Sequence, residues 1–231
     1  MQFMFIGHVS RDIDTVTGIR KEALGGGVFH NAITAARLGE RTRVLTRAAP
    51  AEADRARQVF ADAGIEAVVL AGETSTSIEN TYRNHCPDSR VSRLISRATP
   101  FSVVDLDGVS GGVVLVNPLW FPEFPPELLG ALRDRARTLA IDAQGFLRRP
   151  GEDGTLGLVD WPEKRQWLPL VDVLKVDTNE ARVLTGLEDA PAAAAMLGGM
   201  GPRQVLLTHA AGGGLWDGAN WVEFSFGPYA L

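Results

Sequence analysis

One stretch decides the fold of this chain: Gly25–Gly39, which reads Gly-Gly-Gly-Val-Phe-His-Asn-Ala-Ile-Thr-Ala-Ala-Arg-Leu-Gly. Apolar residues recur at Val28, Ala32 and Ala35, and this spacing predicts a helix. Gly39 is placed to end that helix. The glycines allow a ligand to approach the backbone, and the helix start behind them presents free N–H groups. We therefore expect a binding site at this helix start.

Around this stretch, short apolar runs alternate with amphipathic segments. Such alternation predicts an α/β fold, with a mainly parallel central sheet flanked by helices on both faces. The expected strands are Met1–Gly7, Thr42–Thr46, Ile65–Leu70, Gly112–Asn117, Leu139–Asp142, Val171–Val176, Gln204–Thr208, Leu215–Asp217 and Trp221–Phe224, and the further expected helices are Ala51–Ala63, Pro125–Ala136 and Asp189–Gly199.

The alternation is interrupted at residues 74–97. Thr74–Tyr82 and Arg90–Ser96 are β-prone stretches of mixed polarity on either side of a turn-rich loop. They predict a hairpin outside the main sheet. Two interpretations are open: an ordinary surface hairpin, or a lid that closes over a ligand and excludes water. The Gly- and Pro-rich segment Arg149–Glu163 predicts a loop, to which the sequence assigns no role.

The composition narrows the class of protein. The 231 residues are 45% hydrophobic and 22% charged, as in a soluble single domain. The net charge of −5 and the lack of a Lys/Arg run argue against a nucleic-acid partner. A single cysteine, Cys86, excludes an internal disulfide framework and suits the cytoplasm. The apolar N-terminal run is too short for a membrane segment.

The stretch from Gly26 onward is similar to the first signature of the ribokinase-like (PfkB) carbohydrate kinases, Gly-Gly-x-x-x-Asn-x-Ala-x-x-x-Ala-Arg-Leu-Gly. The resemblance implies a ribokinase-like fold with a small β lid, one incomplete domain over 1–231, and sugar binding by Gly26, Gly27 and Asn31. Asp12 resembles the family's sugar-binding Asp, because a carboxylate accepts hydrogen bonds from adjacent hydroxyls. Asn117 ends a buried strand, so it is a candidate pocket wall, although a turn-forming Asn before Pro fits equally well.

A second resemblance to the same family concerns the residues expected to bind Mg²⁺ and the nucleotide phosphates. The segment from Asp177 resembles the family's Asn-x-x-Glu motif, with Glu180 as the Glu and Asp177 in place of the Asn. The resemblance implies that Glu180 orders Mg²⁺ through water, and that Asp177, Thr208 and Gly213 lie near the nucleotide phosphates. Ala210 replaces the first glycine of the family's Thr-x-Gly-x-x-Gly. The alternative is that Asp177 and Glu180 are two acids at a helix start, which favours acids in any protein.

The family's second signature, Gly-x-Gly-Asp, does not occur between Phe224 and Leu231. In the family, its Asp is the catalytic base and its N–H groups hold the transferred phosphoryl. We therefore assign no catalytic residue within 1–231 and expect the Gly-x-Gly-Asp base beyond Leu231. Because each such element contributes roughly two or more orders of magnitude in rate, we expect residues 1–231 alone to have negligible kinase activity. The expected sugar-binding and metal acids, Asp12 and Glu180, are not expected at a glycine-rich helix start.

The resemblance implies ATP-dependent, Mg²⁺-assisted phosphorylation of a hydroxyl of a small sugar or cyclitol, with in-line transfer. It also implies that the lid pairs with the lid of a second copy in a homodimer. Few basic residues are candidates for a substrate phosphate, namely Arg11, Arg37 and Arg148, so an unphosphorylated polyol is favoured. The alternative is a truncated, non-catalytic sugar- or nucleotide-binding relative. A dinucleotide-binding fold is rejected because Gly25–Gly27 lies too far past the first strand.

Overall fold

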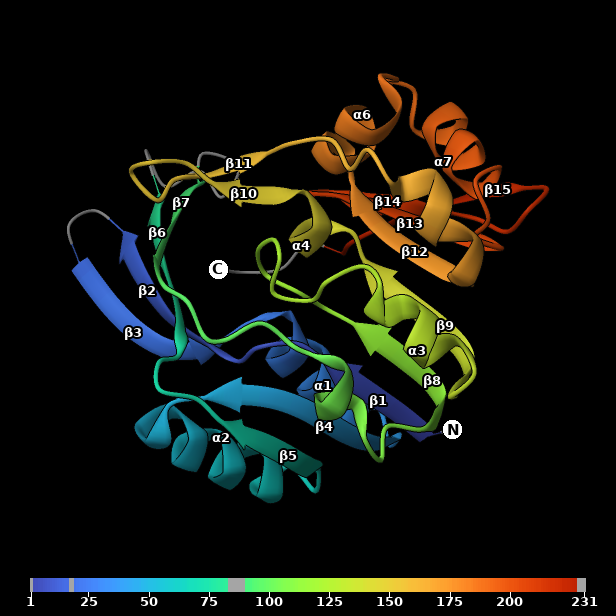
Figure 1. The fold of residues 1–231 in the computed structure, drawn as a ribbon. Coiled ribbons are helices and arrows are strands. Elements are labelled where there is room, and N and C mark those ends of the chain that lie inside the picture. The colour runs from blue at the N-terminus through green and yellow to red at the C-terminus, as the bar shows by residue number, and fades with distance from the viewer. Residues whose placement is uncertain (1, 17–18, 83–89, 228–231) are drawn as a thin grey trace.

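The computed structural model describes residues 2–16, 19–82 and 90–227. Cys86 with its loop and Leu231 lie outside the described residues. The described chain folds around a nine-stranded sheet, in the order β15-β14-β13-β12-β9-β8-β1-β4-β5 (Figure 1). Every neighbouring pair from β13 to β5 is parallel, whereas β14 and β15 are added antiparallel at the end. The predicted α/β architecture is confirmed.

The strands of this sheet match the predicted apolar runs, with ends that differ by a few residues. They are β1 (Gln2–Ile6), β4 (Arg41–Ala48), β5 (Glu66–Ala71), β8 (Gly111–Val116), β9 (Ala136–Asp142), β12 (Val173–Asp177), β13 (Gln204–His209), β14 (Gly212–Trp216) and β15 (Trp221–Ser225).

Helices cover both faces of the sheet. On one face, α1 (Gly27–Arg37) and α2 (Pro50–Asp62) contact β1, β4 and β5. On the other face, α3 (Leu128–Arg133), α6 (Thr178–Thr185) and α7 (Ala190–Gly198) contact β9, β12 and β13. The side chains of β1 alternate accordingly: Met4 and Ile6 lie in one hydrophobic core and Phe5 lies in the other. Two cores therefore hold the sheet between them.

A second sheet stands off the first and holds four strands in the order β3-β2-β6-β7. We call it the lid sheet. Its strands are β2 (Ser10–Val16), β3 (Ile19–Gly25), β6 (Thr76–Tyr82) and β7 (Arg90–Ser96). The sequence predicted the hairpin of β6 and β7 outside the main sheet, and this is confirmed. The sequence did not predict β2 and β3, because their charged and polar side chains give little of the apolar alternation by which strands are recognised.

The predicted loop 149–163 contains a hairpin instead. β10 (Arg148–Pro150) pairs antiparallel with β11 (Leu156–Leu158). Its connecting turn touches the lid sheet, where Leu94 N–H donates to the Gly154 carbonyl at 2.9 Å. A short helix, α4 (Gln144–Leu147), precedes this hairpin, and α5 (Lys164–Trp167) follows it. The hairpin therefore braces the lid sheet at β7, the edge strand farthest from β3.

A buried polar cluster joins the lid sheet to the main sheet. His8, between β1 and β2, is fully buried, and its backbone N–H donates to Glu123 Oε1 at 2.7 Å. Glu123 is also fully buried, and its other oxygen accepts from Leu119 N–H at 2.8 Å. The His8 ring lies 3.0 Å from the hydroxyl of Thr76, the first residue of β6. This cluster fixes the point from which the lid sheet departs.

A groove in the main sheet adjoins α1. Side chains of β8, β9, β12 and β13 line this apolar groove of about 390 Å³, which we call the sheet groove.

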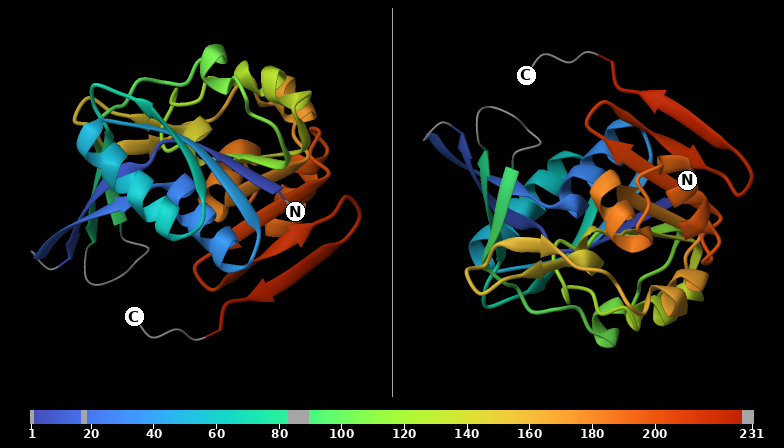
Figure 2. Two further views of the ribbon diagram at one scale, coloured as in Figure 1. Left: turned by 90° about the horizontal axis from the view of Figure 1, so that it is seen from below. Right: turned by 90° about the horizontal axis from the view of Figure 1, so that it is seen from above.

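Across the described residues, no helix is both long enough and apolar enough to span a bilayer. The views from below and above show the lid sheet projecting from the body of the molecule, with β14 and β15 at the far end of the main sheet (Figure 2).

Candidate functional site

The predicted binding stretch lies where the two sheets meet. Gly25 ends β3 and α1 begins at Gly27. A Cβ on Gly25 would come within 2.0 Å of Asp12 Oδ2, so only glycine leaves room for this carboxylate. Gly26 has a φ of 98°, a left-handed conformation that side chains rarely adopt. The glycines thus bring the Asp12 carboxylate to the start of α1, contrary to the expectation that Asp12 would not lie at a glycine-rich helix start.

Asp12 lies on strand β2 of the lid sheet. Its Oδ1 accepts a hydrogen bond from the Ser10 hydroxyl at 2.6 Å. Burial raises the pKa of Asp12, while the Ser10 hydrogen bond opposes this rise. The side chain is only half-buried, so the carboxylate can still accept further hydrogen bonds from a ligand.

Asp12, Gly26 and Gly27 line one pocket of about 200 Å³, which we call the small pocket. Its other polar groups come from the lid sheet, from α1, from the end of β9, from α4 and from β10. Its apolar surface comes from Ile78 and Leu119, which belong to one buried cluster. The small pocket is lined by Ser10, Asp12, Gly26, Gly27, His30, Ile78, Asn80, Arg90, Leu119, Asp142, Gln144 and Arg148.

The structure places Asn31 and Asn117 in the adjoining sheet groove, not in the small pocket. Asn31 was expected to bind the same sugar as Asp12, but the α1 residues that line the small pocket are Gly27 and His30, and Asn31 lines the sheet groove instead. Asn117 is 2% exposed, and its Oδ1 accepts no hydrogen bond in the described structure. Asp142 lines both cavities, so the small pocket and the sheet groove are neighbours.

A hydrogen-bonded chain that the sequence analysis missed crosses the lid sheet above the small pocket. Ser92 Oγ donates to Asn80 Oδ1 at 2.7 Å, and Asn80 Nδ2 donates to Asp14 Oδ1 at 3.0 Å. The three residues stand opposite one another on β7, β6 and β2. Asn80 is buried and its orientation is fixed by both neighbours. No sequence signal pointed to it, because β2 was not predicted as its partner strand.

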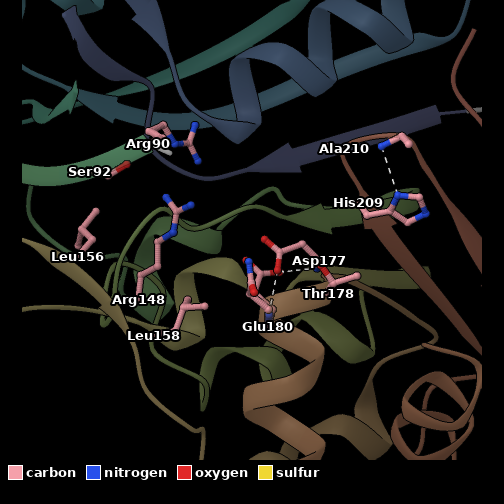
Figure 3. A pocket seen from close by; sticks show the side chains of 12 residues that line it. Arg90, Ser92, Arg148, Leu156, Leu158, Asp177, Thr178, Glu180, His209 and Ala210 are labelled. Atoms are coloured by element: carbon pink, nitrogen blue, oxygen red, sulfur yellow. Dashed lines mark hydrogen bonds between the residues drawn. The ribbon is translucent and has the colours of Figure 1, made fainter. Parts of the chain in front are cut away.

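A larger pocket of about 570 Å³ adjoins the small one, and we call it the large pocket (Figure 3). Asp177 and Glu180 lie at its edge, at the start of α6. Asp177 Oδ1 accepts from Glu180 N–H, and Glu180 Oε2 accepts from Asp177 N–H, both at 2.8 Å. This reciprocal pair is a capping box, so the helix-capping alternative describes their geometry. Arg90, Ser92, Arg148, Leu156, Leu158, Asp177, Thr178, Asn179, Glu180, His209, Ala210 and Ala211 line the large pocket.

One of the acidic residues that line the large pocket is buried. Glu180 is 1% exposed, and burial, followed by the nearby Asp142 charge, raises its pKa to about 7. Lys175 opposes this rise and lies 3.2 Å from Asp142 Oδ2. A carboxyl group with such a pKa exchanges its proton near neutral pH.

The other two expected phosphate-binding residues do not line the large pocket. Thr208 lines the sheet groove. Gly213 is on β14, where a Cβ would come within 2.3 Å of the Leu207 carbonyl oxygen, so its glycine serves strand packing. The residues between Thr208 and Gly213 that line the large pocket are His209, Ala210 and Ala211.

The expected catalytic base concerns the C-terminal end of the chain. The structure describes the chain as far as Gly227, so Leu231 lies outside the described residues. The Gly-x-Gly-Asp base expected beyond Leu231 therefore stays a prediction. The described part of the chain ends with the antiparallel strand β15 and two residues after it.

Comparison with solved structures identifies the family. A sulfate complex of a pyrophosphate-dependent kinase in the ribokinase family is 41% identical and has a TM-score of 0.93, and the match covers 99% of this chain and 80% of that one. The chain belongs to the ribokinase family. A second structure, also 41% identical over the same shares with a TM-score of 0.91, is described as a pyrophosphate-dependent kinase of this family with a pyrophosphate analog and myo-inositol.

A third structure is 39% identical, with a TM-score of 0.91, and the match covers 99% of this chain and 78% of the other. It concerns the conversion of a pyrophosphate-dependent myo-inositol-1 kinase into a myo-inositol-3 kinase by replacing one Asn and one Ser with Leu. No family model and no curated protein matches the sequence. An adenosine kinase from Sinorhizobium meliloti, at 15% identity and a TM-score of 0.79, shares the fold, with coverage of 100% and 81%.

The residues present allow a limited test of the Mg²⁺ expectation. In the described ranges, no three His, Cys, Asp or Glu side chains converge as a metal site. Mg²⁺ commonly keeps several waters and uses one or two carboxylates together with substrate phosphates. Glu180 lines the large pocket, where an Mg²⁺ ion bound to a phosphate donor would lie. The residues therefore fit an ion that arrives with a phosphate donor and reaches Glu180 through water, and they do not fit a preformed cage.

Proposed function

We propose that this ribokinase-family protein transfers a phosphoryl group from pyrophosphate to one hydroxyl of myo-inositol or a closely similar cyclitol. The observation that carries the proposal is the junction of two pockets, one suited to a polyol and one open to a phosphate donor, which share Arg90 and Arg148. Two structures 41% identical to this chain support it, because both are described as pyrophosphate-dependent kinases and one holds myo-inositol.

The small pocket has the chemistry that a cyclitol requires. Asp12 and Asp142 supply carboxylate acceptors for ring hydroxyls, and the side-chain amides of Asn80 and Gln144 can both donate and accept. Ile78 and Leu119 supply apolar contact for the C–H groups of a ring. A compact ring with hydroxyls around its edge matches this mixture better than an extended or aromatic ligand.

The large pocket holds the donor in this proposal. ATP was expected from the family resemblance, and ATP and pyrophosphate present the same diphosphate chemistry. Pyrophosphate is preferred because the relatives at 39–41% identity are described as pyrophosphate-dependent. Mg²⁺ bound with either donor would neutralise charge on the phosphate oxygens, and Glu180 is the residue placed to contact its water shell.

The reaction balances without a further reactant. A cyclitol oxygen forms a bond to one phosphorus of pyrophosphate, the bridging P–O bond breaks, and inorganic phosphate leaves with that bond's electrons. The hydroxyl proton is released. We assign no catalytic base among the described residues, in keeping with the sequence prediction that the base lies beyond Leu231.

Asn80 and Ser92 are the residues that we propose to select the hydroxyl. They form a hydrogen-bonded pair over the junction of the two pockets, in which Asn80 lines the small pocket and Ser92 lines the large one. In a relative, replacing an Asn and a Ser by Leu changes a myo-inositol-1 kinase into a myo-inositol-3 kinase. By analogy, this chain with its polar pair directs transfer to the 1-hydroxyl.

Product analysis tests the proposal. The gene's full product is purified and incubated with Mg²⁺, myo-inositol and either pyrophosphate or ATP, and ³¹P NMR follows the formation of a phosphate monoester. We expect inositol monophosphate with pyrophosphate, and little with ATP. Monoester formation with ATP alone would overturn the choice of donor. A panel of sugars that is phosphorylated in preference to myo-inositol would overturn the choice of acceptor.

Because residues 1–231 alone are expected to have negligible kinase activity, residues 1–231 are tested for binding. Calorimetry with myo-inositol, and separately with pyrophosphate and Mg²⁺, measures whether each pocket takes its ligand without chemistry. We expect both ligands to bind. Failure of both to bind a folded protein would overturn the proposal independently of the rate.

A further inference from the structure

Two arginines stand at the junction of the small and large pockets. Arg90 and Arg148 are the only described residues that line both. Arg90 begins β7 of the lid sheet, whereas Arg148 begins β10 at the end of α4. In the close-up, the side chain of Arg148 extends toward Arg90, with Asp177 and Glu180 on the other side of the pocket (Figure 3). The two positive charges therefore reach the junction from different walls.

Neither guanidinium group has a protein partner in the described structure. No carboxylate of the described residues lies within 4.0 Å of either one, and neither donates a side-chain hydrogen bond to a described residue. Two other arginines with limited exposure are paired with carboxylates: Arg47 donates to Asp105 at 2.6 Å, and Arg133 donates to Asp172 at 2.6 Å. Guanidinium groups without partners beside a pocket are available to a ligand.

The electrostatics favour an anion between the two side chains. Burial lowers the pKa of Arg148, and the charge of Arg90 lowers it further. A guanidinium stays protonated under these conditions, so the lowered pKa means that the charge is held in an unfavourable place. The charges of the Glu180, Asp142 and Asp177 carboxylates raise the pKa of Arg148, but they do not cancel the lowering by burial and by Arg90. An anion in direct contact with both guanidinium groups would stabilise their charge.

We propose that Arg90 and Arg148 together bind the phosphoryl group that is being transferred, one from the lid sheet and one from the body of the molecule. This inference rests on the proposed kinase function and names the groups that hold the donor. Guanidinium groups suit the task because their planar N–H pairs match the oxygens of phosphate. The position also fits, since a transferred phosphoryl group must lie between the donor pocket and the acceptor hydroxyl.

The arrangement has a consequence for pyrophosphate in particular. Pyrophosphate is small and carries several negative charges, and unlike ATP it has no nucleoside that the protein could bind. Its affinity must come from contacts to its phosphate oxygens. Because one of these contacts belongs to β7, donor binding should draw the lid sheet toward α4 and order this end of β7.

Binding measurements on variants test the inference. Calorimetry is done with methylenediphosphonate, a non-cleavable pyrophosphate analogue, and separately with myo-inositol in the absence of donor. We expect Arg90→Gln and Arg148→Gln each to weaken methylenediphosphonate binding by about tenfold to 100-fold, the range for charged hydrogen bonds. Both arginines also border the small pocket, so we expect myo-inositol binding to weaken too, but by a clearly smaller factor than methylenediphosphonate binding. The double variant should lose less than the product of the single losses, because both groups hold one phosphate.

Arg203→Gln is the matched control, because Arg203 is 85% exposed, lies outside both pockets and makes the same change in net charge. It should bind both ligands like the wild type. Hydrogen exchange of the peptide that contains β7 gives a second readout: methylenediphosphonate should slow exchange in the wild type, and less so in Arg90→Gln.

The outcomes separate this inference from the proposed function. If the wild type binds methylenediphosphonate and both arginine variants bind it equally well, the arginine site is refuted while the pyrophosphate donor stands. If the wild type binds only a non-hydrolysable ATP analogue, and both variants weaken that binding, the arginine site stands and the proposed donor falls. If the variants lose myo-inositol binding instead, the arginines belong to the acceptor and the inference is wrong.

Discussion

The carboxylate of Asp12 occupies the space that a side chain at position 25 would need, with Oδ2 only 2.0 Å from the site of a Cβ on Gly25. The two residues lie on neighbouring strands of one antiparallel pair, since Asp12 stands across from Ala23 and Ser10 across from Gly25. The glycine therefore sets the position of the acid that faces the small pocket.

Gly25→Ala should displace the Asp12 carboxylate and weaken myo-inositol binding by at least about tenfold, since charged hydrogen bonds would be lost. Calorimetry measures the affinity. Gly130→Ala is the control, because Gly130 lies in α3 with no atom within 4 Å of the added Cβ. That variant should keep wild-type affinity and gain roughly 0.5–1 kcal/mol in unfolding free energy. Unchanged affinity in Gly25→Ala would show that Asp12 does not contact the cyclitol.

Asp12→Ala should weaken myo-inositol binding by about 1.5–3 kcal/mol through loss of charged hydrogen bonds. Because burial raises the pKa of Asp12 and its ionised form is the better acceptor, affinity in the wild type should increase with pH as the carboxyl group loses its proton. Asp12→Asn should remove this pH dependence. Calorimetry across pH checks both statements, and an equal pH dependence in wild type and Asp12→Asn would assign it to another group.

The double variant Asn80→Leu with Ser92→Leu should change which hydroxyl receives the phosphate. Leucine cannot donate to Asp14 or accept from a ring hydroxyl, so the cyclitol should bind in another orientation. Chiral separation of the inositol monophosphates measures the ratio of products. Ser77→Ala is a lid-sheet control, because Ser77 donates to the Arg11 carbonyl and lines neither pocket. An unchanged product in the double variant would contradict the role of this pair.

The buried pair at the base of the lid sheet should give an unusual pH dependence of stability. Burial raises the pKa of Glu123 to about 8, so unfolding releases a proton and stability falls as pH rises from about 4.5 to 8. Burial lowers the pKa of His8 to about 3, so its contribution to stability rises as pH rises from about 3 to 6.5.

Glu123→Gln should therefore uncover the His8 contribution. Relative to the variant, the wild type should lose up to about 1.4 kcal/mol in unfolding free energy per pH unit between about pH 5 and 8. Urea titrations of both proteins at a series of pH values measure the difference, in which other groups that titrate, such as Glu180, largely cancel. Parallel curves for the two proteins would mean that Glu123 titrates normally.

The capping box can be separated from a role in the donor site. Asp177→Asn keeps a good N-cap residue, so the unfolding free energy should change by less than about 0.5 kcal/mol, whereas Asp177→Ala should cost about 1 kcal/mol. If Asp177 serves only as a cap, Asp177→Asn should also keep the wild-type KM for pyrophosphate. A large rise in that KM without loss of stability would instead place the carboxylate beside the donor.

Much of the main sheet could be predicted because its strands are apolar and its helices periodic. Asp12, Gly26 and Gly27 were predicted from two separate resemblances, and the structure brings them into one pocket. Strands β2 and β3 were missed because a strand in a thin, exposed sheet can be polar on both faces. Without β2, no pattern could reveal that Asn80 is held between Asp14 and Ser92.

Residues that act together across long separations were the least predictable. Arg90 and Arg148 lie far apart in the chain, and neither belongs to a motif that requires the other. Their relationship depends on how far β7 and β10 approach each other, which is set by tertiary contacts such as Leu94 with Gly154. Asn31 lies on α1 and lines the sheet groove, and its predicted sugar contact stays a prediction.

The strand order of the lid sheet determines when its strands can pair during synthesis and folding. Strand β2 pairs in parallel with β6, so Asp14 meets its partner Asn80 across 66 residues of chain. A parallel pairing of this kind forms slowly, because a long loop must close before any contact offsets the entropy. On the ribosome, β2 must wait without its β6 partner while β4, α2 and β5 emerge and fold. The small pocket is thus completed only after β6 has been made, and slow folding would leave the edge of β2 exposed until then.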